Sequence, residues 1–154
     1  KMVNRFHEVC PRNFVNRASE LGMSFPEVIT LASIIQKEAV SSKEKPIISS
    51  VFHNRLKHHM PLQSDPTAVY GIDGFRRKIL PEDIRKDTPY NTYKCRGLPP
   101  GPICNPDVNS IRAALWPART NYLFFVSKGN GYHHFSRTFE EHSRAIQIGN
   151  APGK

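Results

Sequence analysis

The sequence predicts a single α+β domain in which several helices combine with a small antiparallel β-hairpin and a long loop lining a cleft. Three observations support this fold class. Apolar residues recur at helical spacing over 25–39 and 44–58. Two short aromatic runs, 122–126 and 132–136, flank a turn with two glycines. Residues 88–106 are rich in proline and glycine, and 154 residues suffice to bury a core.

The composition limits the possible partners. The net charge of +9, from 22 Lys and Arg against 13 Asp and Glu, favours a polyanion such as nucleic acid, anionic lipid or an acidic cell-wall polymer. The basic residues are spread along the chain and match no nucleic-acid recognition motif, so no nucleic-acid partner is expected. No apolar run approaches the roughly 18 residues that span a bilayer, and no signal peptide is visible. Because the chain opens on Lys1, we expect a piece of a longer protein.

Neither a metal nor another cofactor is expected. The three cysteines, Cys10, Cys95 and Cys104, contain no CxxC spacing, and the seven histidines contain no H-E-x-x-H motif. Cys95 and Cys104 bracket a proline-rich loop and would be able to pair in an oxidising compartment. The sequence leaves that pairing open.

The first half of the chain is predicted to be helical. Residues 2–21 form an irregular helical lead-in that Pro11 interrupts. Ser24–Glu27 matches a capping box with proline in the first turn, which predicts a helix over 25–39. A second helix over 44–58 would complete a helical hairpin.

One carboxylate lies at the end of the apolar face of the first hairpin helix. At 100° per residue, Glu38 lies over Leu31 and within about 60° of Ile34 and Ile35, whereas Gln36 points to the opposite side. Burial raises the pKa of a carboxyl group, and a glutamate tuned in this way can deliver a proton near neutral pH. Glu38 is therefore a candidate general acid. The alternative is a solvated glutamate in the last helical turn.

Residues 62–71 allow two interpretations. Asp65 before Pro66 suits an N-cap with proline at the first helical position, which we favour. The density of hydrogen-bonding side chains would also suit a groove for a hydroxyl-rich ligand. These side chains are Gln63, Ser64, Asp65, Thr67 and Tyr70. Residues 72–87 are predicted to form a surface excursion with a short helix opening at 81–84.

The segment 88–106 is predicted to be a defined loop, because proline fixes backbone angles and glycine permits unusual ones. A loop of about 19 residues inside a compact domain is usually functional. Tyr90 and Tyr93 would be able to stack on sugar rings, and Asn91 to bond hydroxyl or acetamido groups. Alternatively, the tyrosines merely cover the core.

The C-terminal part mixes helix and strand. Asn105 before Pro106 predicts an N-cap and a helix through Leu115. Residues 122–126 and 132–136 form the predicted hairpin, whose alternation places His133 and Phe135 on one face.

A further capping box at 138–141 starts a closing helix to about Gln147, and residues 149–154 are predicted to be a disordered tail.

Taken together, these motifs identify a family resemblance. They are Leu31–Glu38, Leu62–Thr67, Tyr90–Tyr93, Gly97–Ile103, Asn105–Pro106, Tyr122–Val126, His133–Ser136 and Glu141–His142. In this order they resemble the catalytic domain of the MltG (YceG-like) family, the endolytic murein transglycosylases of bacteria. The resemblance is best over residues 20–145, and the implied domain is 1–148 with 1–20 as its lead-in.

The resemblance implies a lyase that cuts peptidoglycan glycan strands between N-acetylmuramic acid and N-acetylglucosamine without water, leaving 1,6-anhydro ends. One carboxyl group suffices for this chemistry, and by its position in the motif that group is Glu38. Many relatives carry a second glutamate where this chain has Gln36; a catalytic group at position 36 would make the chain inactive, but the helical phase favours Glu38. Residues matching motif positions that would line the cleft are Gln63, Ser64, Asp65, Tyr90, Asn91, Tyr93, Asn105 and His133.

Family membership would also imply a location and partners. In the family this domain follows a membrane anchor and a LysM-like domain, so we expect action at the outer face of a bacterial cytoplasmic membrane, beside peptidoglycan synthases. Two other functions remain open: a hydrolytic glycosidase that uses Glu38 with Asp65, and a non-catalytic module that binds glycan or nucleic acid.

Overall fold

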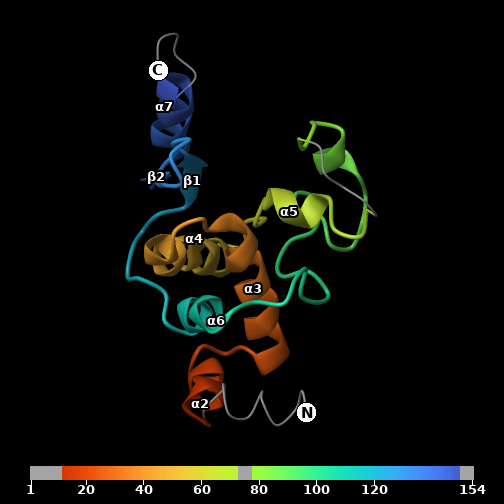
Figure 1. The fold of residues 1–154 in the computed structure, drawn as a ribbon, viewed down its shortest axis with the longest axis vertical. Helices are drawn as coiled ribbons and strands as arrows, with labels where there is room; N and C mark the ends of the chain where they lie inside the picture. Colours follow the sequence, from red (N-terminus) through yellow and green to blue (C-terminus); the bar gives the residue numbers. More distant parts are fainter. Residues whose placement is uncertain (1–11, 73–77, 150–154) are drawn as a thin grey trace.

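The computed structural model describes residues 12–72 and 78–149 and has the predicted α+β architecture. Its central layer consists of three helices: α3 (Phe25–Glu38), α4 (Lys45–Lys57) and α6 (Val108–Leu115). The short helix α2 (Arg12–Glu20) packs at one end, and the hairpin with α7 (Phe139–Gly149) occupies the other (Figure 1). Cys10 and Pro11 lie outside the described residues.

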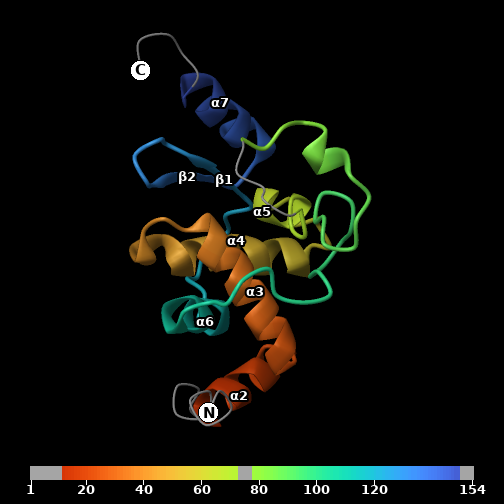
Figure 2. The same cartoon turned by 45° about the vertical axis from the view of Figure 1, so that its right-hand side comes forward.

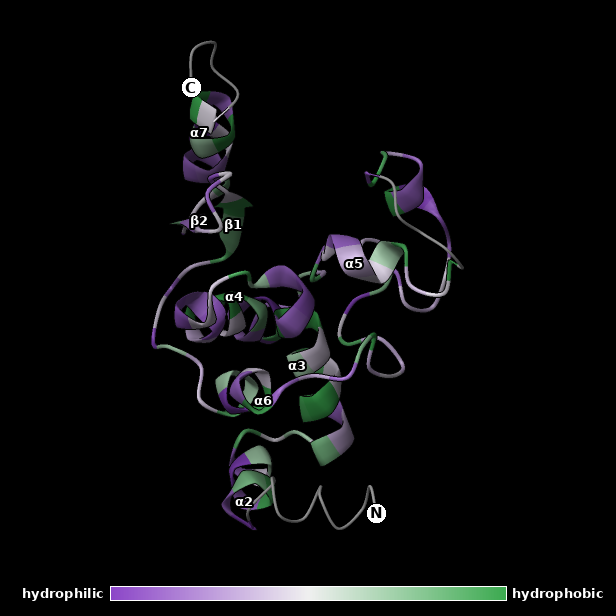
Figure 3. Ribbon diagram, in the orientation of Figure 1, coloured by the Kyte–Doolittle hydropathy of each residue, from purple (hydrophilic) through white to green (hydrophobic). Residues whose placement is uncertain are grey.

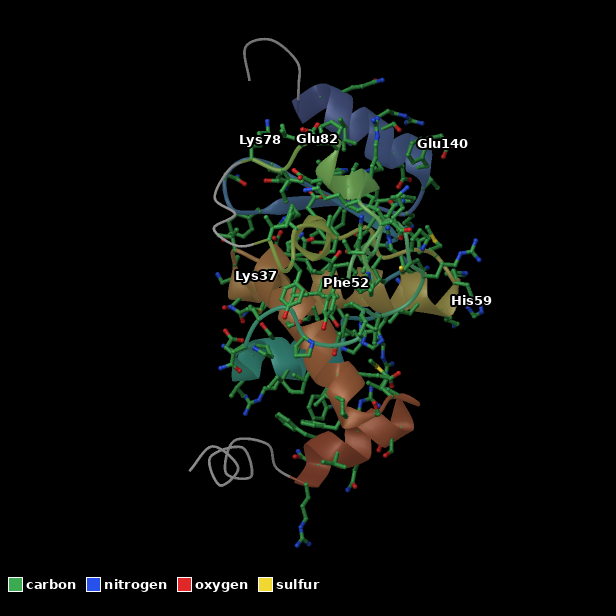
Figure 4. The ribbon with its side chains drawn as sticks, turned by 90° about the vertical axis from the view of Figure 1, so that its right-hand side faces the viewer. Lys37, Phe52, His59, Lys78, Glu82 and Glu140 are labelled. Carbon is green, nitrogen blue, oxygen red and sulfur yellow. The ribbon has the colours of Figure 1, made fainter. Side chains whose placement is uncertain are left out.

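The core lies where the three central helices meet. Phe52, Leu31 and Ile34 are at most 1% exposed, and Phe52 lies well inside the outline of the molecule whereas His59 and Lys37 lie toward its edges (Figure 4). Apolar residues concentrate on α3 and β1 (Figure 3). Within the described residues, no helix has the length and apolarity needed to cross a bilayer.

The helical hairpin is confirmed with small changes at its ends. Ser24 Oγ accepts a hydrogen bond from the Glu27 amide at 3.3 Å, and Glu27 Oε2 accepts one from the Ser24 amide at 2.8 Å, which is the predicted capping box. The second helix is divided into a 3₁₀ turn, η1 (Ser42–Glu44), and α4. Because α3 ends at Glu38 and the next residue is extended, that side chain sits at the rim of the helical layer.

Two predicted caps are wrong. Asp65 is the first residue of the short helix α5 (Asp65–Ala68) and makes no cap bond; the N-cap position belongs to Ser64, and the Asp65 carboxylate accepts the Tyr93 hydroxyl instead. The cap of α6 is Asp107, two residues after the predicted one, because its carboxylate accepts the Ser110 amide at 2.7 Å.

The long loop 88–106 contains no helix or strand, as predicted, and is held by specific contacts. The Ser33 hydroxyl accepts the Ile103 amide at 3.0 Å. A Cβ at Gly101 would lie 3.2 Å from the Tyr90 hydroxyl, so glycine permits this close approach. The preceding excursion contains the 3₁₀ turn η2 (Asp83–Arg85), close to the predicted short helix; 73–77 lie outside the described residues.

The hairpin pairs β1 (Phe124–Ser127) with β2 (His133–Ser136) in antiparallel register, and it lies between α4 and α7 (Figure 2). In the closing capping box, Thr138 Oγ1 accepts the Glu141 amide at 3.2 Å, while the Glu141 carboxylate accepts the amide of Arg137 rather than of Thr138. Gly149 is the last residue of α7 and not part of a disordered tail; 150–154 lie outside the described residues.

Candidate active site

A pocket of about 310 Å³ opens beside the C-terminal end of α3, where the helical layer meets the hairpin. Its walls come from α3, α4, the 62–65 segment, the long loop, the hairpin and α7. The lining residues are Glu38, Arg55, Leu62, Gln63, Asp65, Tyr93, Phe125, Val126, Ser127, His133 and His142. The fold therefore brings five predicted site residues to one cavity: Glu38, Gln63, Asp65, Tyr93 and His133.

Glu38 is the titratable group whose environment is most suited to proton transfer. Desolvation by burial raises its pKa from 4.5 to about 6, and the Asp65 carboxylate acts in the same direction. A hydrogen bond from Ser64 and the charge of His133 oppose this rise. A carboxyl group with a pKa near 6 is partly protonated at neutral pH and can exchange a proton in either direction.

Ser64 fixes the orientation of the Glu38 carboxyl group. Its hydroxyl donates to Glu38 Oε1 at 2.6 Å, and its own backbone amide donates to Thr92 Oγ1 at 2.9 Å. Thr92 also pairs with Thr67 through their hydroxyls at 2.8 Å. The sequence prediction had Ser64 line the cleft, whereas it is 1% exposed and lies behind the carboxyl group.

The Asp65 carboxylate and the Tyr93 hydroxyl form the adjacent part of the wall. Tyr93 donates to Asp65 Oδ1, and burial together with this bond raises the pKa of Tyr93. The neighbouring Gln63 has a positive φ of 52°, a conformation that non-glycine residues adopt at some cost and that often marks functional sites.

His133 reaches the pocket from β2 and is held from behind by Glu44. The Glu44 carboxylate lies 2.8 Å from His133 Nδ1 and accepts the His133 backbone amide at 3.0 Å. Because a carboxylate only accepts, Nδ1 carries the hydrogen and Nε2 remains for a ligand. Both residues are at most 9% exposed.

Sequence reasoning missed six of the lining residues, and the two ionisable ones among them are Arg55 and His142. Arg55 had been interpreted as part of the helical spacing of the second helix, although an arginine among apolar positions was itself a signal. His142 belongs to the quoted family motifs, but its position on the exposed helix α7 gave no reason to place it in the cleft.

Three predicted cleft residues lie elsewhere. Asn91 is fully buried, and its amide donates to the carbonyls of Ile84 and Lys86 at 3.1 and 2.7 Å, so it secures the loop. Tyr90 packs against Tyr70 with ring centroids 4.4 Å apart. Asn105 is exposed before α6. None of the three is among the pocket-lining residues.

Gln36 faces away from the pocket, as its helical phase predicts. Its Oε1 accepts the Ser110 hydroxyl at 2.7 Å, the Asp107 amide at 3.3 Å and Lys45 Nζ at 3.4 Å. Gln36 therefore joins α3 to α4 and α6.

Two of the three cysteines lie in the part of the chain that the structure describes. Cys95 and Cys104 are both free thiols. The ranges 12–72 and 78–149 contain no group of three or more metal-ligating side chains.

The chain belongs to the YceG-like family, whose model matches residues 1–148. Among characterised relatives, it is 46% identical over 123 residues to an endolytic murein transglycosylase of Bacillus subtilis, and 34% identical over 126 residues to that of Streptococcus pneumoniae. These matches cover 80% and 78% of the chain. The chain spans only 34% and 23% of the length of those relatives.

A solved structure shows the same fold. A 2.6 Å crystal structure of a yceG-like protein from Listeria monocytogenes superposes with a TM-score of 0.79 at 41% sequence identity. The match covers 86% of this chain and 43% of the Listeria chain.

Proposed function

We propose that this chain is the catalytic part of a peptidoglycan lytic transglycosylase in which Glu38 is the single acid/base. The observation that carries the proposal is a carboxyl group with a pKa of about 6 in a polar pocket. The names of the B. subtilis and S. pneumoniae relatives support the reaction class.

The reaction needs two proton transfers, both through the same carboxyl group. The Glu38 carboxylic acid protonates the glycosidic oxygen, the bond from the muramic acid C1 to that oxygen breaks, and N-acetylglucosamine leaves with a free 4-hydroxyl. The C6 hydroxyl oxygen then bonds to C1, and its proton returns to the Glu38 carboxylate. No water enters, and the product carries a 1,6-anhydro end.

The surrounding residues suit these two steps. The Ser64 hydrogen bond keeps Glu38 Oε1 in place and stabilises the carboxylate between the steps. The Asp65 carboxylate provides negative charge near a developing oxocarbenium ion, and it also contributes to the raised pKa of Glu38. His133, held by Glu44, offers Nε2 to a sugar hydroxyl.

One observation keeps a hydrolytic alternative open: Asp65 lines the same pocket and is a second carboxylate. In a hydrolase Asp65 would act as nucleophile or activate water. Its hydrogen bond from Tyr93 favours an electrostatic role instead.

The wider setting follows from the same proposal. The expected substrate is the glycan strand of peptidoglycan, at the outer face of the cytoplasmic membrane and near the enzymes that synthesise it. The net charge of +9 suits a wall that carries peptide carboxylates.

Mass spectrometry of purified glycan strands tests the proposal. We expect anhydro-ended fragments from the parent chain and none from Glu38→Gln. Glu140→Gln is the matched control, because Glu140 is an exposed glutamate at the surface of α7 (Figure 4), and it should cut as the parent does. Products heavier by one water would instead establish the hydrolase, and an active Glu38→Gln chain would refute the acid/base assignment.

A further inference from the structure

Arg55 is a buried cation in the pocket wall without an acidic partner in the described part of the chain. It is 7% exposed. Its Nε donates to the Leu123 carbonyl at 2.7 Å, and Nη1 donates to the Pro61 and Leu62 carbonyls at 2.9 and 3.2 Å and to Gln63 Oε1 at 3.4 Å. All four acceptors are neutral. The positive charge is therefore hydrogen-bonded but not compensated.

The remaining nitrogen of this guanidinium group, Nη2, makes no hydrogen bond within the described residues. It is also not among their fully enclosed unpaired polar atoms, and Arg55 is one of the residues that line the pocket. Burial lowers the pKa of Arg55, yet a guanidinium group remains charged at neutral pH. Two N–H donors and a full charge are thus available to a ligand.

His142 lines the same pocket as this cation, and both contact the Phe124 ring. Its ring stacks on Phe124 with centroids 5.1 Å apart, and the Arg55 guanidinium carbon lies 5.1 Å from the centroid of the same Phe124 ring. His142 Nδ1 is enclosed and has no hydrogen-bond partner among the described residues. Burial and the charges of Arg55 and His134 lower the pKa of His142.

An uncompensated buried charge is costly unless a ligand supplies the opposite charge or a strong acceptor. Of the two sugars in the proposed substrate, N-acetylglucosamine carries no such group beyond its hydroxyls and acetamido group. Muramic acid adds a lactyl ether at C3, which ends in a carboxylate in peptide-free strands and in an amide carbonyl where a peptide is attached. The lactyl end is thus the feature of the strand that matches Arg55.

We propose that Arg55 and His142 form the recognition point for the lactyl carbonyl oxygens of muramic acid and thereby select the sugar placed in the pocket. This inference rests on the proposed function and deepens it, because the pocket would then bind the muramic acid whose bond from C1 to the glycosidic oxygen breaks after Glu38 protonates that oxygen. A carboxylate pairs with a guanidinium group more strongly than an amide does, so peptide-free strands should bind more tightly than peptide-bearing ones.

Binding to the Glu38→Gln chain, which should not turn over, tests this recognition. The ligands are a peptide-free tetrasaccharide of alternating N-acetylglucosamine and N-acetylmuramic acid, its peptide-bearing counterpart, and chitotetraose, which lacks the lactyl group. Calorimetry gives Kd, and the imidazole NMR signals of His142 report the place of binding. We expect the peptide-free tetrasaccharide to bind at least about tenfold more tightly than chitotetraose and to shift the His142 signals.

Two further substitutions, each added to Glu38→Gln, should reduce the preference for the tetrasaccharide over chitotetraose. They are Arg55→Lys, which keeps the positive charge but loses the paired N–H donors of the guanidinium group, and His142→Phe on the exposed helix α7. Arg112→Lys, an exposed arginine on α6, is the matched control and should leave it unchanged. A general structural defect would instead weaken the binding of all three ligands to a similar extent. If Arg55→Lys fails to fold, His142→Phe carries the test.

Equal affinity for the tetrasaccharide and chitotetraose, absence of binding by both, or a preference that survives both substitutions would overturn the inference. A peptide-free ligand that binds more tightly than the peptide-bearing one identifies the carboxylate as the group recognised, and equal affinity identifies the shared carbonyl. Strand cleavage by the parent without any lactyl preference would defeat this inference alone. A lactyl preference without cleavage would defeat the proposed function alone.

Discussion

The last turn of α3 carries two polar clusters that face opposite ways, one around Gln36 and one around Glu38. In the Gln36 cluster, Lys45 Nζ pairs with Asp107 at 2.8 Å, and Gln36 and Ser110 complete the hydrogen bonds. Partial burial opposes ionisation of Asp107, but the bonds from Lys45 and Ser110 prevail and lower its pKa. In the Glu38 cluster no cation contacts the carboxyl group within the described residues, and burial raises its pKa to about 6.

The difference shows how one helical turn holds both a structural and a reactive polar group. A carboxylate that accepts hydrogen bonds from a lysine and a backbone amide is stabilised in its ionised form. A carboxyl group that is buried beside a serine and another carboxylate has a raised pKa and is therefore partly protonated near neutral pH. The neighbours that α3 meets on each side, rather than the helix itself, determine which role each position has.

The strongest challenge to this comparison is to exchange the two side chains. A chain with Gln36→Glu and Glu38→Gln together has an unchanged net charge, but its carboxyl group would lie among Lys45, Ser110 and the Asp107 amide and outside the pocket. We expect turnover of glycan strands to fall about 10²- to 10⁴-fold, the usual contribution of a general acid. Quantitative mass spectrometry of anhydro-ended products measures the loss.

The single substitution Gln36→Glu is the control for this exchange and should keep turnover close to that of the parent, because Glu38 remains in place. Activity retained by the exchanged chain would mean that position 36 can supply the proton, which would refute the division between the clusters.

The Gln36 cluster should be sensitive in stability instead of turnover. Asp107→Asn leaves Lys45, whose side chain is 5% exposed, without its anion. Because Asp107 is itself 48% exposed, we expect a loss of about 1–3 kcal/mol in the free energy of unfolding, measured by urea denaturation. Adding Lys45→Met should recover part of this loss. Turnover per folded molecule should stay unchanged, and a large fall in it would tie this cluster to the reaction.

The Glu38 cluster should instead make stability depend on pH. The folded pKa of about 6 lies above the ordinary value of 4.5, so the contribution of Glu38 to stability is fully present below pH 4.5 and is lost as pH rises through about 6. The shift corresponds to about 2 kcal/mol.

Glu38→Gln removes this dependence. We expect its free energy of unfolding, relative to the parent, to rise by about 2 kcal/mol between pH 4 and pH 7.5. Urea denaturation at both pH values measures this difference, and a constant difference would mean that Glu38 is not desolvated.

The sequence predicted those features that depend on near neighbours. The capping box at Ser24 and Glu27, the hairpin around its glycines and the placement of Glu38 opposite Gln36 all follow from spacings of a few residues. The predicted N-caps at Asp65 and Asn105 were wrong because several residues able to cap a helix lie close together in each segment. Tertiary contacts determine which of them caps: Tyr93 bonds to Asp65, and Lys45 pairs with Asp107.

Site features that depend on distant pairs could not be predicted from spacing. The Glu44 carboxylate meets His133 across 89 positions, and Arg55 reaches Leu123 across 68. The length and composition of the loop led to the prediction that Asn91 would contact a ligand. Its side-chain amide instead donates to two backbone carbonyls, which a buried loop must also satisfy. The composition of this loop thus indicated its importance but not which polar groups face the pocket.

The finest test of the Glu38 cluster concerns one hydrogen bond. Ser64→Ala removes the donor at 2.6 Å that stabilises the Glu38 carboxylate, so the pKa of Glu38 should rise above its value in the parent. Because the reaction begins with protonated Glu38, the alkaline limb of the profile of kcat/KM against pH should move to higher pH, although loss of the oriented carboxyl group lowers the maximum. Ser50→Ala is the control, since Ser50 bonds to Ile47 and Thr120 and not to Glu38, and it should leave the limb in place. A limb that moves to lower pH in Ser64→Ala would show that Ser64 stabilises the acid rather than the carboxylate, which would reverse its role in the site.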